Sequence, residues 1–349
     1  MINFELTEPE VISSYNLARK SDLVFSEILT LSQFQEINPK NITIIESNDR
    51  YIFYKKKEYR LKSNDIVFCN TNLVTELFKD LRKVKNLKNL TLITNQTDDK
   101  IDKKLFLKKP KSILNWFSVN VAYEHKNLIP IPLGLSNNYS PKNLRASEFK
   151  SIMFSKEFNK NKLMYLNFNV NTNSSLRAPL ENIYKNEQWS YYEKNTLTLE
   201  NYSKNLKEYK FVLCPQGNGI DTHRIWEALY SGAIPVIQKH ISHKNLEGLP
   251  ILFLDDLRNI SSEKLTTYLE KINYEDLDFN KLTCSYWLNI MKSKLDEDDS
   301  IENIIKVNNL SDNWFVFKFK IIGRYKSKLK IFKYYLKKVG RLINIKNEN

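Results

Sequence analysis

The stretch FVLCPQGNGIDTHRIWEALYSGAIPVI, residues 211–237, decides the fold of this chain. It contains three of the seven glycines of the chain, and two of them, Gly217 and Gly219, lie between an apolar run and a helical segment. A second apolar run follows Gly232. Strand, loop, helix and strand in this order form the right-handed βαβ unit of a parallel sheet. The stretch therefore predicts an α/β fold.

The loop and the helix of this unit have recognisable ends. Gly217 and Gly219 allow backbone conformations that are closed to other residues, and they let the backbone approach a ligand closely. We expect Asp221 to be the N-cap of a helix of about ten residues and Gly232 to follow its last turn. The apolar side of this helix faces the core.

The other side of the helix carries Arg224 in its first turn and Glu227 one turn later. A helix N-terminus favours anions, and a guanidinium group offers a fork for phosphate oxygens. A carboxylate further along suits a vicinal diol such as a ribose. The pattern therefore indicates a site for a nucleoside diphosphate. An alternative stays open, in which the glycines only make a turn and the two charged residues form a surface ion pair.

Two common nucleotide motifs are absent from this stretch. Thr222 stands where a Rossmann G-x-G-x-x-G motif would have its third glycine, and no G-K-[ST] follows the loop. Dinucleotide oxidoreductases and P-loop NTPases are therefore disfavoured.

The rest of the chain repeats the α/β pattern. In the first half, strands are predicted at 41–47, 65–70, 90–99 and 118–123, with a helix over 73–87. The two prolines and the glycine of 128–138 suit a chain that leaves one layer for another. In the second half, we expect strands at the start of 162–177 and at 250–257, and helices at 199–209 and 261–272. The chain is long enough for two domains. We predict an N-terminal Rossmann-like domain at 1–145, a C-terminal Rossmann-like domain at 146–310 and a basic amphipathic tail at 311–349.

The charge of the chain is concentrated in that tail. The formal net charge is +14, and residues 311–349 carry net +9. Apolar residues recur in the tail at intervals of three or four, with basic residues elsewhere on the helical wheel. A basic amphipathic helix suits an anionic bilayer. A last helix that packs on the enzyme is the alternative, and no nucleic-acid partner is expected because no known reader motif appears.

Cysteine usage and apolar runs indicate the compartment. Cys69, Cys214 and Cys284 are far apart and form no CxxC pair, which indicates a reducing compartment and no structural zinc. The start of the chain has early acidic residues, and no run of about 18 apolar residues occurs. We expect a cytoplasmic protein, peripheral on the inner face of the membrane.

Residues 211–237 resemble the donor-site signature of exostosin-like glycosyltransferases and their bacterial relatives. That signature reads roughly F-x-L-x-P-x-G, then D-x-x-R-x-W-E-A-L and G-x-I-P-V. The resemblance extends more loosely over residues 65–257. It implies the GT-B-like architecture, with two Rossmann-like parallel-sheet domains that face a cleft. It also implies a glycosyltransferase that uses a nucleotide sugar, UDP- or GDP-linked, and no other cofactor.

The resemblance also implies roles for individual residues. The diphosphate is expected at Gly217, Gly219 and Arg224, and the ribose at Glu227. The loop is lined by Asn218, Asp221 and Thr222, and Arg177 adds a further phosphate or sugar contact.

An inverting relative needs a general base on the acceptor hydroxyl. The candidates come from the first domain and are Asp98 or Asp99 after the strand at 90–99, and Glu124 or His125 before 128–138. Relatives often carry His-Asn where this chain has Asn95 and Gln96, which leaves the base open. No metal is expected, because Arg224 and the helix dipole assist departure of the diphosphate.

The reading from sequence is thus an inverting, metal-independent transferase that moves a sugar to a hydroxyl of a surface polysaccharide or lipid-linked glycan. Two alternatives remain: a fucosyltransferase-type enzyme with a GDP-sugar donor, and a non-catalytic module that binds membranes or nucleic acids.

Overall fold

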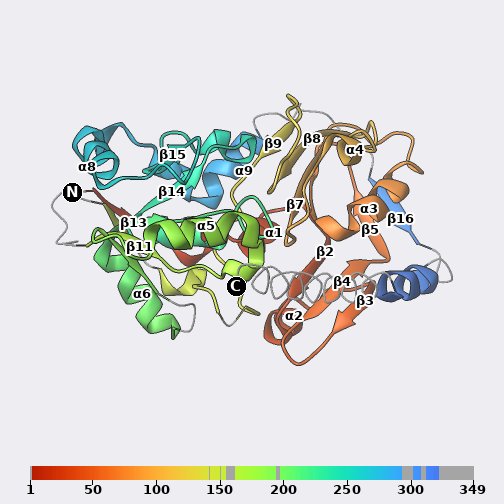
Figure 1. The fold of residues 1–349 in the computed structure, drawn as a ribbon. Coiled ribbons are helices and arrows are strands. Elements are labelled where there is room, and N and C mark those ends of the chain that lie inside the picture. Colours follow the sequence, from red (N-terminus) through yellow and green to blue (C-terminus); the bar gives the residue numbers. More distant parts are fainter. Residues whose placement is uncertain are drawn as a thin grey trace, which may run out of the picture.

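The computed structural model describes residues 2–140, 142–149, 151–154, 162–193, 197–292, 302–307 and 312–321. The chain forms two α/β units, each built on a largely parallel sheet (Figure 1). The predicted α/β class, with two Rossmann-like units built on largely parallel sheets, is confirmed. Of the predicted tail at 311–349, residues 312–321 are helical, and 322–349 lie outside the described residues.

The first unit contains a seven-stranded sheet of order β3-β4-β2-β6-β7-β8-β9. The strands β2, β6, β7, β8 and β9 run parallel, and β3 and β4 add an antiparallel edge. Their bounds are Leu23–Leu29 (β2), Ile42–Ser47 (β3), Ile52–Lys56 (β4), Ile66–Asn70 (β6), Leu90–Asn95 (β7), Ile113–Ser118 (β8) and Leu128–Pro130 (β9). The helices of this unit are α1 (Ser14–Arg19), α2 (Leu31–Ile37), α3 (Val74–Leu81) and α4 (Lys103–Phe106).

The strand predicted at 118–123 is wrong, because β8 ends at Ser118, where the prediction begins. Val119 and Val121 are buried, which produced the strand-like pattern. Between them, Asn120 has φ 55°, in the left-handed region, which ends an extended strand. The helix predicted over 73–87 is shorter than expected, since α3 ends at Leu81.

The second unit contains a five-stranded, fully parallel sheet of order β12-β11-β13-β14-β15. Its strands are β11 (Lys162–Leu166), β12 (Ser190–Tyr192), β13 (Tyr209–Leu213), β14 (Ile234–Gln238) and β15 (Leu252–Leu254). Its helices are α5 (Ser174–Tyr184), α6 (Leu199–Glu208), α7 (His223–Tyr230), α8 (Ser262–Lys271) and α9 (Cys284–Lys292).

The βαβ unit predicted from residues 211–237 is present as β13, α7 and β14. Gly232 has φ 70° directly after the C-cap Ser231, as expected. The predicted N-cap is wrong: α7 begins at His223, and Thr222 is the N-cap residue without a side-chain cap hydrogen bond. The side chain of Asp221 instead accepts hydrogen bonds from Leu133 N and Trp226 Nε1.

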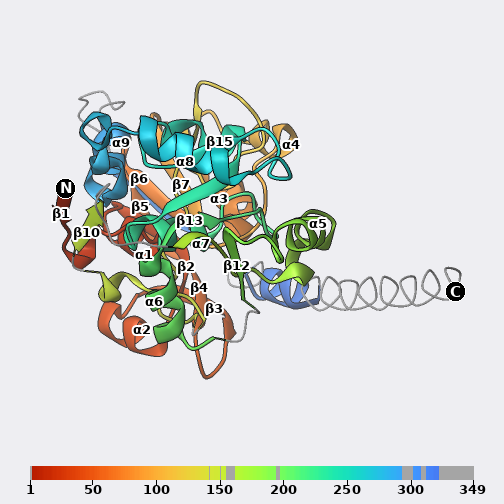
Figure 2. The same ribbon diagram turned by 60° about the vertical axis from the view of Figure 1, so that its left-hand side comes forward.

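The chain crosses between the two units at several points. Strand β1 (Ile2–Glu5) pairs with β10 (Ser151–Phe154), and β16 (Asn303–Lys306) returns to pair with β5 (Glu58–Leu61) in the first unit. Figure 2 shows β1 and β10 together beside α9. One apolar cluster contains residues of both units, for example Phe68 and Phe117 of the first with Val212 and Trp226 of the second. The two units therefore share a core, and the boundaries at 145 and 310 stay predictions.

Candidate functional site

A cleft of about 480 Å³ lies where loops of both units meet. Its walls come from the loops that follow β7, β9, β11 and β13, which are residues 95–98, 133–137, 172 and 217–224, together with Ser14, Tyr139, Ser140, Asn143, Arg177 and Glu227. Ligands of open α/β sheets bind beyond the carboxyl ends of the parallel strands. The cleft has this position in both sheets, and we take it as the candidate site.

Arg224 lines the cleft from the first turn of α7. Its side chain is half-buried, and its Nε is enclosed without a hydrogen-bond partner among the described residues. Burying a guanidinium N–H without a hydrogen-bond partner costs free energy, because the group loses its contacts with water. The N-cap residue Thr222 makes no side-chain cap hydrogen bond, so it does not occupy the free N–H groups at the N-terminus of α7. The end of this helix therefore suits an anion.

Two further polar atoms of the cleft are buried without a hydrogen-bond partner among the described residues. They are Thr222 Oγ1 and Asn95 Nδ2. Native proteins leave few buried polar atoms unsatisfied, and those that remain often mark a place where a ligand or water binds. Together with Arg224 Nε, they offer three donors at the cleft.

The two loop glycines serve close packing and not an unusual backbone conformation. Neither Gly217 nor Gly219 is among the glycines with positive φ. A Cβ atom on Gly217 would lie 3.2 Å from Arg177 Nη2, and one on Gly219 would lie 3.0 Å from the side-chain amide of Asn120. Both glycines are therefore required because a side chain already fills the adjacent space.

Arg177 is predicted to contact phosphate or sugar, and the structure shows that its guanidinium also holds backbone oxygens. Its Nε, Nη1 and Nη2 donate to the backbone oxygens of Gln216, Asn169 and Pro215 at 2.9–3.0 Å. The side chain is only 4% exposed. Burial and the nearby charge of Arg224 lower the pKa of Arg177 to about 10, so the group remains charged at neutral pH. Arg177 lines the cleft, but its main contacts hold the glycine loop in shape.

Asn120 connects the first unit to the glycine loop that carries Gly217 and Gly219, and sequence reasoning missed it. Its Oδ1 accepts hydrogen bonds from Ile220 N at 2.8 Å and Asp221 N at 3.0 Å. Its Nδ2 donates to Thr97 O at 3.2 Å, in the loop that carries Asp98. The signal in the sequence was an Asn between two valines, since Asn is one of the residues that adopt the left-handed region most readily.

Asp221 is 4% exposed at the base of the cleft. Its carboxylate accepts from Leu133 N at 2.8 Å, which links the glycine loop to the segment after β9. Burial raises the pKa of Asp221 to about 7, although the hydrogen bonds from Leu133 N and Trp226 Nε1 oppose the rise.

Glu227 is buried and joins three segments. Its Oε1 accepts from Asn143 Nδ2 and Leu144 N, and its Oε2 accepts from Tyr202 OH at 2.8 Å. The alternative of a surface ion pair with Arg224 is wrong, since Glu227 is 2% exposed and its hydrogen bonds come from these three donors. The carboxylate lines the cleft and also fixes the loop that carries Asn143.

The remaining donor-side predictions also lie at the cleft. Asn218 is exposed at its mouth, and Thr222 forms the wall before α7. His223, which sequence reasoning passed over, lines the cleft with its Nδ1 2.8 Å from Gly134 O. Because a carbonyl only accepts, Nδ1 carries the proton and Nε2 is left as an acceptor in the neutral ring.

The four candidates for the general base lie at different distances from the cleft. Asp98 and Asp99 are both exposed on the loop after β7, and of the two only Asp98 lines the cleft. Glu124 is highly exposed and pairs with Lys244 at 3.3 Å. The ring of His125 lies 4.6 Å from the ring of Phe106 at an interplanar angle of 44°, and its Nδ1 accepts from Asn127 N. Of the four candidates, Asp98 lines the cleft and Asp99, Glu124 and His125 do not, and the choice of the base stays a prediction.

Within the described ranges, no group of three or more His, Cys, Asp or Glu side chains is placed to hold a metal ion. The three cysteines are free and buried, and burial raises their pKa.

The βαβ unit and its loop lie inside the region that comparison with protein families identifies. Residues 159–276 match the RXYLT1 C-terminal domain. This region spans β11 to α8 and contains the glycine loop, Arg177, Arg224 and Glu227. Over this third of the chain, the predicted resemblance to exostosin-like glycosyltransferases is confirmed.

The other comparisons are weaker. No curated protein matches the chain. Two solved structures are similar in outline. The first is an α1,3-fucosyltransferase with GDP-fucose, at 13% identity and a TM-score of 0.34, and the match covers 70% of this chain and 80% of that one. The second is a GtfA/B complex, at 11% identity and a TM-score of 0.31, and the match covers 73% of this chain and 62% of that one. Likeness at this level says nothing about the site.

Proposed function

We propose that the protein is a glycosyltransferase that moves a sugar from a nucleoside diphosphate donor to a hydroxyl of a surface polysaccharide or lipid-linked glycan. The match to the RXYLT1 C-terminal domain supports glycosyl transfer as the class of reaction. The observation that carries the donor assignment is Arg224, whose guanidinium lines the cleft with its Nε unpaired, behind a glycine loop and at a helix N-terminus.

In this proposal, the diphosphate lies against Gly217, Gly219 and the N-terminal turn of α7, with Arg224 on its oxygens. The backbone N–H groups at the start of α7 and the guanidinium of Arg224 both donate to the phosphate oxygens. In an enclosed site, these hydrogen bonds outweigh the free energy that it costs to withdraw the phosphate from water. Glu227 faces the ribose with the acceptor capacity that its three hydrogen bonds leave free. Thr222 Oγ1 supplies a further hydrogen bond.

The proposed reaction is a single displacement with inversion. The acceptor hydroxyl loses its proton to Asp98 while its oxygen forms a bond to the anomeric carbon. The bond between that carbon and the phosphate oxygen breaks, and the nucleoside diphosphate leaves with the electron pair. Arg224 and the dipole of α7 stabilise the negative charge that develops, without an obligatory metal ion.

His223 is a second candidate for the general base in this scheme. Its Nε2 is an acceptor in the neutral ring, and the residue lines the same cleft as Asp98. A matched pair of variants, Asp98→Asn and His223→Gln, assigns the base. The variant that removes it lowers kcat by 10²–10⁴-fold, a range typical of general-base loss, and leaves nucleotide binding intact.

The proposal includes two wider expectations from the sequence. A lipid-linked acceptor places the enzyme at an anionic membrane surface, contacted through residues 311–349, on the cytoplasmic side. Among the residues that the structure describes, none of the helices combines the length and apolar character needed to cross a bilayer. The alternative of a fucosyltransferase-type enzyme differs in its donor base, GDP in place of UDP.

A binding screen tests the donor site. UDP, GDP and their sugars are added at increasing concentration, and the rise in melting temperature is measured for the parent protein, Arg224→Ala and, as a control, Arg258→Ala. Arg258 is an exposed arginine paired with Asp256, outside the cleft. We expect one nucleotide family to stabilise the parent and the control, by about 2.7 kcal/mol at 100 times Kd, and Arg224→Ala to lose this response. Equal responses in all three proteins contradict the donor site.

The rival from another class is a non-catalytic module that binds membranes or nucleic acids. It predicts no response to any nucleotide sugar, together with RNA binding that weakens with salt.

A further inference from the structure

The helix at 312–321 is fixed to the first unit by its inner side. The carboxylate of Asp312 pairs with Lys55 and accepts from Thr43 Oγ1, and both members of the ion pair are at most 3% exposed. Phe319 packs 6.0 Å from the ring of Phe53, and Lys55 lies over the ring of Phe315 at 5.4 Å. The orientation of this helix is therefore set by a buried ion pair and by aromatic packing.

The outer side of the same helix is also apolar. Trp314, Phe317 and Ile321 recur at helical spacing and are 65%, 56% and 49% exposed. The rings of Trp314 and Phe317 stack at 5.8 Å. A surface helix normally turns a polar face to water. A helix with apolar residues on both sides indicates that its outer side contacts something other than water.

A dense positive charge lies on the same unit. Residues 79–111 contain 11 Lys and Arg against four Asp, net +7, so the remainder of residues 1–310 is close to neutral. Among described residues, no ion pair involves the exposed Lys85, Lys103, Lys104, Lys108 or Lys111. Leu107 stands among these lysines and is 68% exposed. The charge is thus local and does not follow from the lysine-rich composition of the whole chain.

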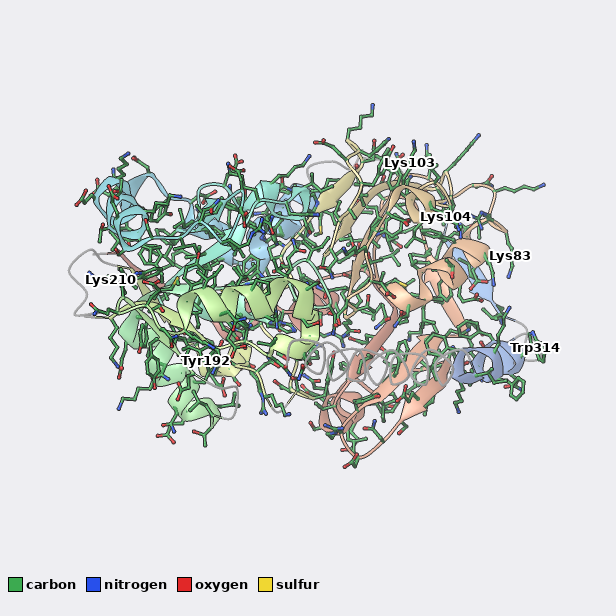
Figure 3. All side chains as sticks on the ribbon, in the orientation of Figure 1. Lys83, Lys103, Lys104, Tyr192, Lys210 and Trp314 are labelled. Carbon is green, nitrogen blue, oxygen red and sulfur yellow. The ribbon has the colours of Figure 1, made fainter. Side chains whose placement is uncertain are left out.

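Both features lie on one side of the molecule. In Figures 1 and 2, α4 and the blue helix at 312–321 lie toward the same side, away from α6. Figure 3 shows Lys83, Lys103, Lys104 and Trp314 at the end of the first unit that is remote from Lys210 and Tyr192. We call the outer side chains of helix 312–321 and the lysines of 79–111 with Leu107 the docking face.

We propose that the docking face binds the surface of an anionic lipid bilayer. Tryptophan and phenylalanine favour the interface between headgroups and acyl chains, and lysines beside them gain from negative headgroups. A polynucleotide accounts for the lysines but not for a separate exposed stripe of Trp314, Phe317 and Ile321 together with Leu107. The inference extends the proposed membrane contact to the body of the protein, and it rests on the proposed function only for the reason to dock, a lipid-linked acceptor.

Flotation with vesicles tests the docking face with the full chain. The probes are vesicles of phosphatidylcholine alone and of phosphatidylcholine with 30% phosphatidylglycerol. The variants are Trp314→Ala/Phe317→Ala and Lys103→Glu/Lys104→Glu, and Lys204→Glu/Lys207→Glu on α6 is the charge-matched control. All replaced side chains are exposed, so the fold should persist, as a circular dichroism spectrum checks.

We expect the parent protein to bind the anionic vesicles and to be released by salt. The Lys103/Lys104 variant should bind at least tenfold more weakly, since each lysine near such a surface contributes about 1 kcal/mol, and the aromatic variant should lose at least fivefold. The control should bind like the parent.

Three results overturn the proposal. They are equal binding of parent and docking-face variants, an equal loss in the control, and binding to RNA without binding to vesicles. Because residues 322–349 also carry basic side chains, parent binding alone does not decide the question and the variants do. Nucleotide binding by the aromatic variant, measured separately, distinguishes failure of this inference from failure of the proposed donor site.

Discussion

The side-chain oxygen of Asn120 lies 3.0 Å from the backbone nitrogen of Asp221, across the junction between the two units. The same side chain donates to Thr97 O, so one amide ties the glycine loop to the loop of Asp98. In the proposed enzyme, these two loops hold the donor and the acceptor. Their relative position is then set by a residue that carries out no chemistry itself.

Replacement of Asn120 tests this coupling. Asn120→Ala removes both acceptor bonds and the bond to Thr97, and we expect donor affinity to fall by about tenfold, as 1–2 kcal/mol of hydrogen bonding implies. Asn120→Asp keeps the acceptor for Ile220 N and Asp221 N and loses only the donation to Thr97. It should therefore retain more donor affinity than Asn120→Ala, as isothermal titration with the responding nucleotide measures. Equal affinity in both variants contradicts the separate roles of the two amide atoms.

Gly219→Ala complements that experiment from the other side. The added Cβ would lie 3.0 Å from the Asn120 amide, which is held by three hydrogen bonds and cannot move freely. We expect weaker nucleotide binding in Gly219→Ala and little change in Gly248→Ser, a glycine whose Cβ would meet only the end of Lys281. Gly248 has φ 88°, so its replacement costs some stability but should not affect binding.

The two arginines of the cleft should respond differently to truncation. Arg177→Ala removes the guanidinium donor from three backbone oxygens, and we expect a loss of about 2–4 kcal/mol of stability because Arg177 and its bond to Pro215 O are buried. Arg224→Ala removes a guanidinium whose Nε has no partner, so unfolding in urea should change by less than about 1 kcal/mol while nucleotide binding is lost. Equal destabilisation by the two substitutions would show that Arg224 is also structural.

Asp221 should make stability fall as the pH rises. Burial raises the pKa of this carboxyl from 3.8 to about 7, so the folded state keeps a proton that the unfolded state has released. Between pH 4 and pH 7, this group alone lowers the free energy of unfolding by a few kcal/mol, at about 1.4 kcal/mol per pH unit. Asp221→Asn should remove that slope, which urea titrations of parent and variant across the range can measure. Parallel curves for the two proteins would exclude the effect.

His243 should act in the opposite sense on the acid side. Burial first, and the charge of His240 second, lower the pKa of this imidazole from 6.5 to about 4. Below pH 6.5, the unfolded state takes up a proton that the folded state refuses, so stability is lost as the pH falls toward 4. The loss should be on the order of 2–3 kcal/mol by linkage. His243→Leu should reduce the acid loss relative to the parent, as urea titrations of the two proteins between pH 7 and pH 4 can measure.

The sequence was sufficient for the βαβ unit and for the end of α7. Gly232 followed the last turn as expected, because a left-handed residue after a helix strongly favours glycine. The position of Arg224 at the start of α7 also followed from spacing alone. The start of the helix was harder to place: Asp221 looks like a cap, but a buried indole and a backbone amide of another loop attract its carboxylate more strongly.

Contacts distant in the sequence explain the other corrections. In the sequence, Arg177 resembles a free surface cation. The fold shows that its guanidinium donates hydrogen bonds to three backbone oxygens. Glu124 and His125 follow the carboxyl end of β8, where a functional residue of a parallel sheet is expected, but the loop after β8 takes them away from the cleft.

The sequence by itself determined the α/β class, the glycine loop and the helix that presents Arg224, because periodicity, turn residues and helix ends depend on neighbours along the chain. The tertiary structure alone decided which of the candidate side chains meet in the cleft, that Asn120 joins the two units, and that Glu227 and Arg177 are held by buried partners. These properties depend on burial and on hydrogen bonds between residues about 25 to 120 positions apart, for which local sequence patterns contain no information.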